Sequence, residues 1–207
     1  MLETLKSLLE AAKATTYELL ALLLPGGVIL AVLEKTCGVT VPFGTIGAIA
    51  AAYMFGTALQ AVGDFILKRK RIAGWIERDK SEWQPTAGYA LQVIQKRLQA
   101  VPKEATLDIC LTQVGARRVV YDKFIALRDT ARGLAFATVI TAVLVIEDNW
   151  ATLSSGTTSS AVAKVCGAIV VATVLFLAFI QRYSRFQPLA HQAVYGQFLA
   201  TQLDAKD

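Results

Sequence analysis

His191 is the only histidine in the 207-residue chain, so it is the first residue to consider for acid–base chemistry. A histidine titrates near neutral pH and is the side chain that most often transfers protons in enzymes. The three cysteines lie far apart and form no CxxC pair, which argues against a zinc site. The sequence also has no phosphate-binding glycine-rich loop, no GxSxG motif and no HExxH motif. We therefore expect a protein that is not an enzyme and binds no cofactor or metal, with His191 solvated or packed.

Arg185 supplies one alternative, because five residues separate it from His191. This spacing resembles the Arg-x4–6-His signature of HEPN ribonucleases. The resemblance implies that the arginine stabilises charge developing on a phosphate while the histidine transfers a proton. It therefore implies a membrane-tethered ribonuclease as an alternative function of the chain.

The elements that must position these residues are the helices of a membrane protein. Hydrophobic residues make up 55% of the chain, its mean hydropathy is +0.48, and the excess is concentrated in blocks. A helix of about 20 apolar residues crosses the hydrocarbon core of a bilayer. We expect four such spans, at residues 17–33, 43–67, 133–150 and 161–181. The third has a short apolar part, so we expect Arg132 to snorkel at one end and a loop to begin at Glu147.

The second span carries a small residue at every fourth position along one helical face. Small side chains let two membrane helices bring their backbones close together. Two interpretations stay open: packing within one subunit, or an interface in a homo-oligomer. The residues concerned are Gly44, Ala48, Ala52 and Gly56.

Gln60 and Asp64 are polar groups near the end of the same span, where exposure to lipid is costly. They are candidates for the polar lining of a pore, in which Asp64 would form a ring of like charges. In the alternative, Asp64 forms an i,i+4 ion pair with Lys68.

Pro25, Gly26 and Gly27 lie in the middle of the first span. A proline inside a helix removes a backbone donor, and membrane helices tolerate this when neighbours satisfy the freed carbonyl. The three residues are therefore candidates for a hinge or for close packing. Residues 2–13 precede this span with an amphipathic pattern, which is typical of a surface helix or of the first turns of the span itself.

Residues 68–132 form the main polar segment, with fourteen lysines and arginines and seven acidic residues. Three helical patterns follow one another in it, at residues 87–101, 107–114 and 120–131. The segment is too small to bury a large core alone. We expect a helical layer beside the membrane, joined by a helix that begins after Pro188 in the tail, residues 182–207.

The distribution of charge predicts the topology. The basic segment and the arginines after the fourth span lie on one side, whereas Lys35 and Lys164 are the only basic residues on the other. The positive-inside rule places both termini in the cytoplasm and two short loops outside. We therefore expect a multi-pass protein of the bacterial inner membrane.

The basic residues beside the second span have two candidate partners. They can fix the topology and contact anionic lipid, or they can bind an acidic protein or a nucleic acid. Direct binding of nucleic acid is not favoured. The candidate contact residues are Lys68, Arg69, Lys70, Arg71, Arg117 and Arg118.

A further pattern resembles small multi-pass membrane proteins of bacterial antiphage defence. These include the membrane subunit of the Kiwa system and the pore-forming accessory protein of Cas13b-type CRISPR. The resemblance implies a homo-oligomer in the inner membrane that acts with a cytoplasmic protein. The residues that carry it are Tyr17-Glu18, Pro25-Gly26, Gly56-Thr57-Ala58-Leu59-Gln60, Gly63, Arg117, Arg128 and Arg132.

The sequence thus predicts an all-α membrane protein with four spans and a helical cytoplasmic layer. The leading functional hypothesis is an antiphage component that acts as a pore or as a sensor and platform for a cytoplasmic partner. The alternative is a channel or transporter subunit, which is disfavoured because no span carries a charge at mid-depth.

Overall fold

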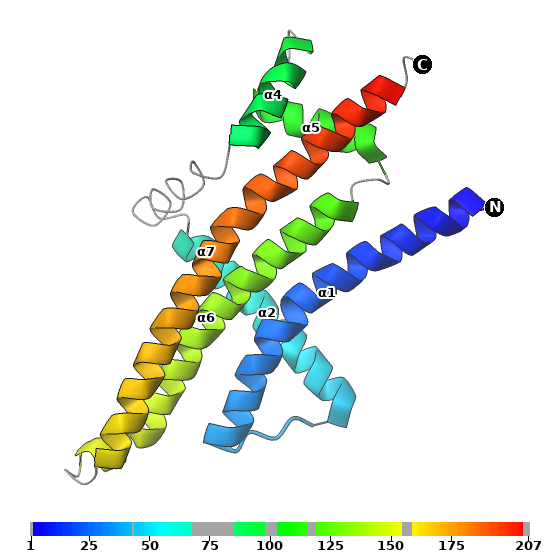
Figure 1. Ribbon diagram of the computed structural model, residues 1–207. Coiled ribbons are helices and arrows are strands. Elements are labelled where there is room, and N and C mark those ends of the chain that lie inside the picture. Colours follow the sequence, from blue (N-terminus) through cyan, green and yellow to red (C-terminus); the bar gives the residue numbers. More distant parts are fainter. Residues whose placement is uncertain are drawn as a thin grey trace. The chain divides into compact units, whose positions relative to one another are not determined.

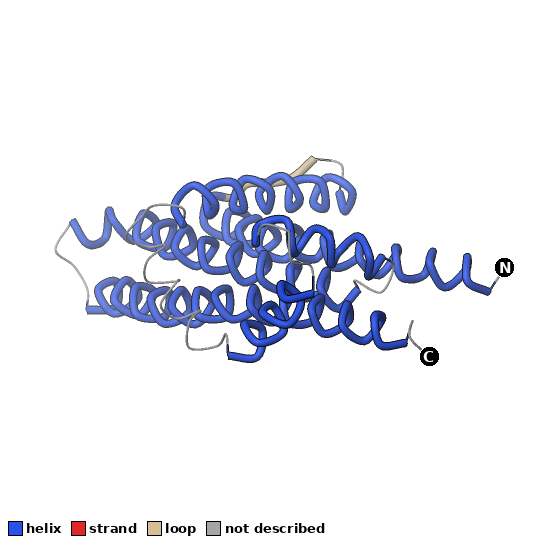
Figure 2. The backbone as a smooth tube through the Cα atoms, turned by 90° about the horizontal axis from the view of Figure 1, so that it is seen from above, coloured by secondary structure: helices blue, strands red, loops and turns tan. Residues whose placement is uncertain are grey.

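The computed structural model describes residues 2–42, 44–67, 85–97, 103–115, 119–154 and 159–204, and within these ranges it contains helices and no strand (Figure 1). The predicted all-α fold is confirmed. Figure 2 shows the same helices from a second direction. Their bounds are α1 Leu2–Cys37, α2 Gly44–Leu67, α4 Pro85–Arg97, α5 Lys103–Val114, α6 Val119–Ser154 and α7 Ser159–Asp204.

Four of the described helices contain a segment long and apolar enough to cross a membrane. By length and composition these segments are Leu19–Cys37, Gly44–Leu67, Val119–Ser154 and Ser159–Thr201. Each of them overlaps one of the four predicted spans. The chain therefore has the helices of a multi-pass membrane protein.

Several helices are longer than the sequence patterns predict. The amphipathic segment 2–13 and the first span form one continuous helix, α1, which includes Pro25. The expected loop start at Glu147 is wrong, since α6 continues to Ser154. Its polar side chains fit the helix, with Asn149 Nδ2 donating to the carbonyl oxygen of Val145 at 2.8 Å. The tail does not start a new helix after Pro188, because α7 runs through that residue.

The chain divides into two compact units, and α1, α6 and α7 each pass from one to the other. The spanning unit comprises residues 19–69 and 129–182. The terminal unit comprises residues 1–18, 70–128 and 183–207.

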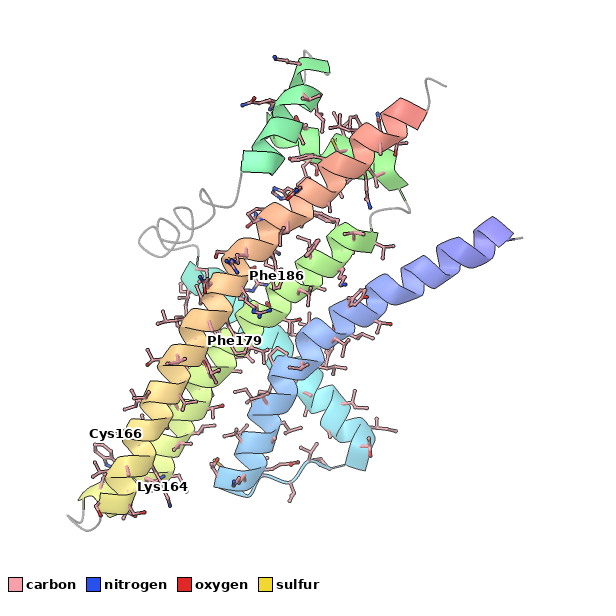
Figure 3. The ribbon with its side chains drawn as sticks, viewed as in Figure 1. Lys164, Cys166, Phe179 and Phe186 are labelled. Carbon is pink, nitrogen blue, oxygen red and sulfur yellow. The ribbon has the colours of Figure 1, made fainter. Side chains whose placement is uncertain are left out.

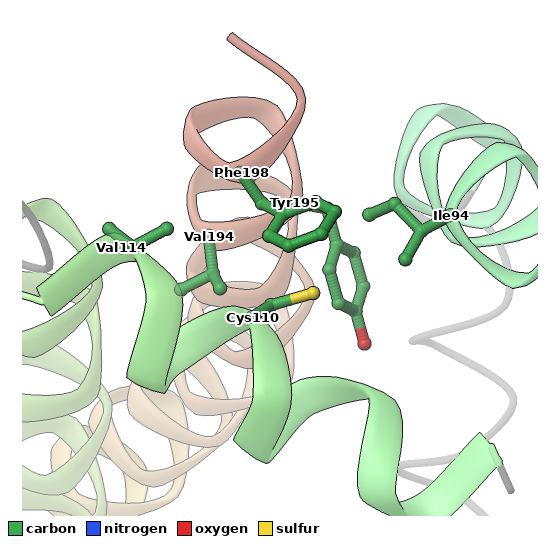
Figure 4. Packing of buried hydrophobic residues seen from close by; sticks show 6 residues of the cluster. All are labelled: Ile94, Cys110, Val114, Val194, Tyr195 and Phe198. Atoms are coloured by element: carbon green, nitrogen blue, oxygen red, sulfur yellow. The ribbon is translucent and has the colours of Figure 1, made fainter. Parts of the chain in front are cut away.

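The terminal unit has its own apolar core, built from α4, α5 and the carboxyl-terminal part of α7. Its central side chains are Ile94, Cys110, Val114, Val194, Tyr195 and Phe198 (Figure 4). Burial in this core raises the pKa of the Cys110 thiol to about 11. Elsewhere in the unit, the Arg128 guanidinium lies 5.9 Å from the ring centroid of Tyr183, a cation–π contact. These contacts agree with the expected helical layer.

In the spanning unit α6 packs against α7, and α1 crosses α2. The rings of Phe136 and Phe176 meet edge to face with centroids 6.0 Å apart. Outward-facing side chains such as Ile46, Met54 and Phe65 remain more than half exposed. An apolar exterior of this kind suits helices surrounded by lipid, where helix contacts depend on close packing and on polar bonds.

Candidate functional site: a buried arginine in the spanning unit

Arg132 of α6 is the most buried charged side chain among the described residues, with 7% of the residue exposed. Its Nη1 pairs with Oδ1 of Asp64 on α2. Its Nη2 lies 3.4 Å from Oδ1 of Asp129, three residues earlier on α6. Its Nε donates to Oε1 of Gln60 at 2.6 Å. All three nitrogens of the guanidinium thus have a partner, as a buried charge requires.

Gln60 connects this arginine to two backbone carbonyls. Its Nε2 donates to the carbonyl oxygen of Asp129 at 2.6 Å and to that of Ala21 at 3.4 Å. Ala21 lies four residues before Pro25, so its carbonyl oxygen is the one that the missing N–H of Pro25 leaves without a helical donor. Gln60 therefore supplies the hydrogen-bond donor that Pro25 lacks in α1.

Glycines let the three helices approach closely enough for these bonds. A methyl group at Gly133 of α6 would lie 2.6 Å from Cγ of Pro25 and 3.2 Å from Nε2 of Gln60. One at Gly63 of α2 would lie 3.0 Å from Cγ of Arg132. Pro25 is itself fully buried. A larger residue at either glycine would push the helices apart and lengthen the hydrogen bonds.

The crossing of α1 and α2 uses a reciprocal pair of glycines. A Cβ atom at Gly26 would overlap the carbonyl oxygen of Ala52, and one at Gly56 would overlap that of Leu22. Each helix thus presents its backbone to a glycine of the other. Gly27, in contrast, has no described atom within 4 Å of where its Cβ would be.

The four small residues of the second span therefore have different surroundings. Ala52 and Gly56 are buried against α1 of the same chain, so packing within one subunit accounts for them. Gly44 is exposed and Ala48 is half-buried. Gln60 and Asp64 contact Arg132. The predicted partner of Asp64, Lys68, lies outside the described residues, as do Arg69, Lys70, Arg71, Arg117 and Arg118.

Arg185 and His191 lie on α7 in the terminal unit, and both are half-buried. The His191 ring has its centroid 6.2 Å from that of Tyr195. Six helical positions separate the arginine and histidine by about 9 Å along the axis and about 120° around it. The helix alone therefore does not bring the two side chains to one point.

The network around Arg132 neutralises charge and holds helices together. It combines one guanidinium with two carboxylates and one amide, which suits charge neutralisation and helix association. Among the described residues no group of three His, Cys, Asp or Glu side chains could hold a metal ion.

The sequence patterns did not identify Arg132 as the centre of this network, because its position at the start of a short span predicted snorkelling. Asp129 was missed as well. The available signal was a charge pair at i,i+3 on one span and two polar residues at i,i+4 on another, each near the end of its span. No protein-family model, curated protein or solved structure matches the chain.

Proposed function

We propose that the protein is a homo-oligomeric inner-membrane platform of a bacterial antiphage system, which holds a cytoplasmic protein partner at the bilayer. The observation that carries this proposal is the pairing of Arg132 with Asp64, Asp129 and Gln60 inside one chain. This network, with its buried and fully partnered charge, holds three helices in a fixed arrangement. A platform needs a rigid arrangement of helices, because it must hold its partner in a fixed place.

The same pairing argues against a pore lined by Asp64. A ring of carboxylates selects cations when the charges face water and repel one another. Asp64 instead contacts a guanidinium of its own chain, which cancels most of its charge. Its side chain keeps 49% exposure, so one oxygen can still reach water. The pore is therefore the second candidate.

The terminal unit supports the holding of a partner. It has a core of its own, so its surface can be shaped independently of the bilayer. The positive-inside rule predicts that this unit lies in the cytoplasm. Exposed polar side chains of α4, α5 and α6 offer hydrogen bonds and charges to a soluble protein; these include Gln92, Lys96, Asp108, Thr112 and Lys123.

The antiphage role rests on the resemblance of the sequence to small membrane components of defence systems. Its test is the plating efficiency of a phage panel on cells that express the protein with its genomic neighbours. We expect protection from at least one phage, and loss of protection with Gly56→Leu, which separates α1 from α2. Protection that is equal with and without the intact gene would contradict the role.

Planar-bilayer recording separates the platform from the pore. Purified wild-type protein and Asp64→Asn should both give no ion current in reconstituted bilayers. Asp148→Asn is the matched control, because Asp148 is an exposed acid of α6 outside the network. A cation current whose selectivity changes in Asp64→Asn but not in Asp148→Asn would establish the pore and remove the platform.

A further inference from the structure

In the spanning unit, side chains of α1, α2 and α6 line a groove with a volume of about 280 Å³. Figure 3 shows the side chains of these three helices. Each helix supplies one buried side chain to the floor of the groove: Ile29 of α1, Leu59 of α2 and Phe136 of α6. All nine described residues that line the groove are apolar. A groove with such a lining holds no water, because a bound water molecule needs polar partners. Its occupant must therefore be apolar.

The groove is open along one side. Its rim contains Phe55, Val62 and Val139, which are exposed, in contrast to the floor. Val62 is 49% exposed, whereas Ile46, which lies on the outside of α2 and away from the groove, is 79% exposed. The rim therefore connects the floor with the apolar exterior of the spanning helices. In a multi-pass membrane protein that exterior is surrounded by lipid chains.

The groove has the length and the width of a single lipid chain. Along α2 its lining runs from Phe55 to Ile66 on one helical face, a distance of about 16 Å. Half of the hydrocarbon core of a bilayer is about 15 Å thick. The volume divided by this length gives a mean cross-section of about 17 Å², or a width of about 5 Å. A hydrocarbon chain fits this width. An α-helix with its side chains is about 10–12 Å across, so a helix of a second copy is too wide to fill the groove.

The floor of the groove is attached to the polar network around Arg132. Phe136 follows Arg132 by one turn of α6, and a Cβ atom at Gly63 of α2 would lie 3.0 Å from Cε2 of Phe136 and 3.0 Å from Cγ of Arg132. The hydrogen bonds and the ion pair of Arg132 hold α2 and α6 together at this point. The shape of the floor is therefore set by contacts within the chain before any ligand binds, which lowers the free-energy cost of binding.

We propose that this groove binds one acyl chain of a phospholipid as a resident lipid. The part of α2 that lines it lies toward Leu67, the end that the positive-inside rule predicts to be cytoplasmic, so the phospholipid belongs to the cytoplasmic leaflet. A chain in the groove contacts three helices at once and gains more dispersion attraction than a chain on an open helix surface. This phospholipid therefore exchanges more slowly than the surrounding lipid. The inference goes beyond the proposed function and does not depend on it.

Native mass spectrometry of the protein extracted from membranes tests the proposal. We expect one phospholipid per chain to stay bound after washing in mild detergent. Ala58→Trp fills the groove from its open side, because Ala58 lines the groove and is exposed. The bound phospholipid should then fall about tenfold, equivalent to about 1.4 kcal/mol of binding free energy. Ala61→Trp is the matched control, since Ala61 is an exposed alanine of α2 outside the groove, and this variant should retain the phospholipid. Circular dichroism checks that both variants keep the helical fold.

A second measurement uses the unaltered chain. The protein is reconstituted with phosphatidylethanolamine that carries a diazirine in its acyl chain, washed in mild detergent and illuminated. Peptide mass spectrometry should find crosslinks at Leu59 and Phe136 of the floor and none at Ile46 or Met54, although the latter two are far more exposed. Equal labelling of the two pairs, no phospholipid retained by the wild type, or equal retention by Ala58→Trp would overturn the proposal. So would a retained free fatty acid or detergent molecule in place of a phospholipid.

Discussion

A double-mutant cycle between Pro25 and Gln60 tests the polar network most directly. Gln60→Leu keeps the approximate volume of the side chain but removes its bonds to the carbonyls of Ala21 and Asp129 and to Nε of Arg132. Hydrogen bonds between membrane helices average about 0.6 kcal/mol. A bond to a charged group contributes about 1.5–3 kcal/mol. Two bonds of the first kind and one of the second predict a loss of about 3–4 kcal/mol.

Pro25→Ala changes what the amide of Gln60 does. Alanine restores a backbone N–H that can donate to the carbonyl oxygen of Ala21, so that oxygen no longer depends on Gln60. In the Pro25→Ala background, Gln60→Leu should therefore destabilise the fold by a smaller amount. The reduction should equal one hydrogen bond between membrane helices, which is about 0.6 kcal/mol on average and about 1.7 kcal/mol at most. The difference between the two backgrounds is the coupling energy that the cycle isolates.

The assay is reversible unfolding of the four proteins in mixed micelles titrated with a denaturing detergent, followed by circular dichroism. Pro188→Ala serves as the matched control, because Pro188 also lies inside a helix but belongs to the terminal unit. Its coupling to Gln60→Leu should be zero within about 0.3–0.5 kcal/mol, the usual limit of additivity for distant sites. Additive effects of Pro25→Ala and Gln60→Leu within the same limit would refute the assignment of Gln60 to the freed carbonyl.

Four further predictions concern the remaining contacts. Arg132→Met should destabilise the fold by about 1.5–3 kcal/mol because it removes the guanidinium that pairs with Asp64, whereas Arg132→Met with Asp64→Leu should recover part of that loss in the same unfolding assay. Gly56→Leu should destabilise the fold by more than Gly27→Leu, since only the first position meets a backbone carbonyl of another helix, and equal losses would contradict the crossing. Maleimide at pH 7.5 should label Cys37, which is exposed at the end of α1, but label Cys110 only after unfolding. Burial raises the pKa of Cys110 from 9.0 to about 11. The stability that its neutral thiol contributes is therefore complete below pH 9 and is lost as the pH rises toward 11. Cys110→Ala should abolish this pH dependence of stability.

The four spans could be predicted from the sequence because an apolar helix in a bilayer must have a minimum length, and hydropathy records that length directly. Helix ends were less predictable. Polar residues from Glu147 to Ser154 predicted a loop, yet a polar side chain such as Asn149 can bond to the preceding turn and continue the helix. Pro188 predicts a helix start because proline suits the first turn, but α7 continues through it, although an interior proline removes one backbone hydrogen bond.

The candidate site was predictable only in part. Gln60 and Asp64 stood out because polar groups in a span are costly, but their partner lies about 70 positions later in the chain, which no local pattern records. A proline implied that some carbonyl needed a donor, and the sequence could not say which donor would meet it. The meeting of Ala21, Gln60 and Arg132 depends on how three helices cross, and that depends on glycines whose fit is set by the packing itself.

The link between Pro25, Gln60 and Arg132 has a consequence for how the chain is made. Synthesis produces α1 and α2 before α6, so the bond from Gln60 to the carbonyl of Ala21 can form early, whereas the carboxylate of Asp64 lacks Arg132 until α6 is made. The first two spans are therefore an incomplete structure until residue 132 has been translated and inserted. A ribosome that stops before this point leaves a fragment in which Asp64 lacks the arginine that pairs with it in the finished chain.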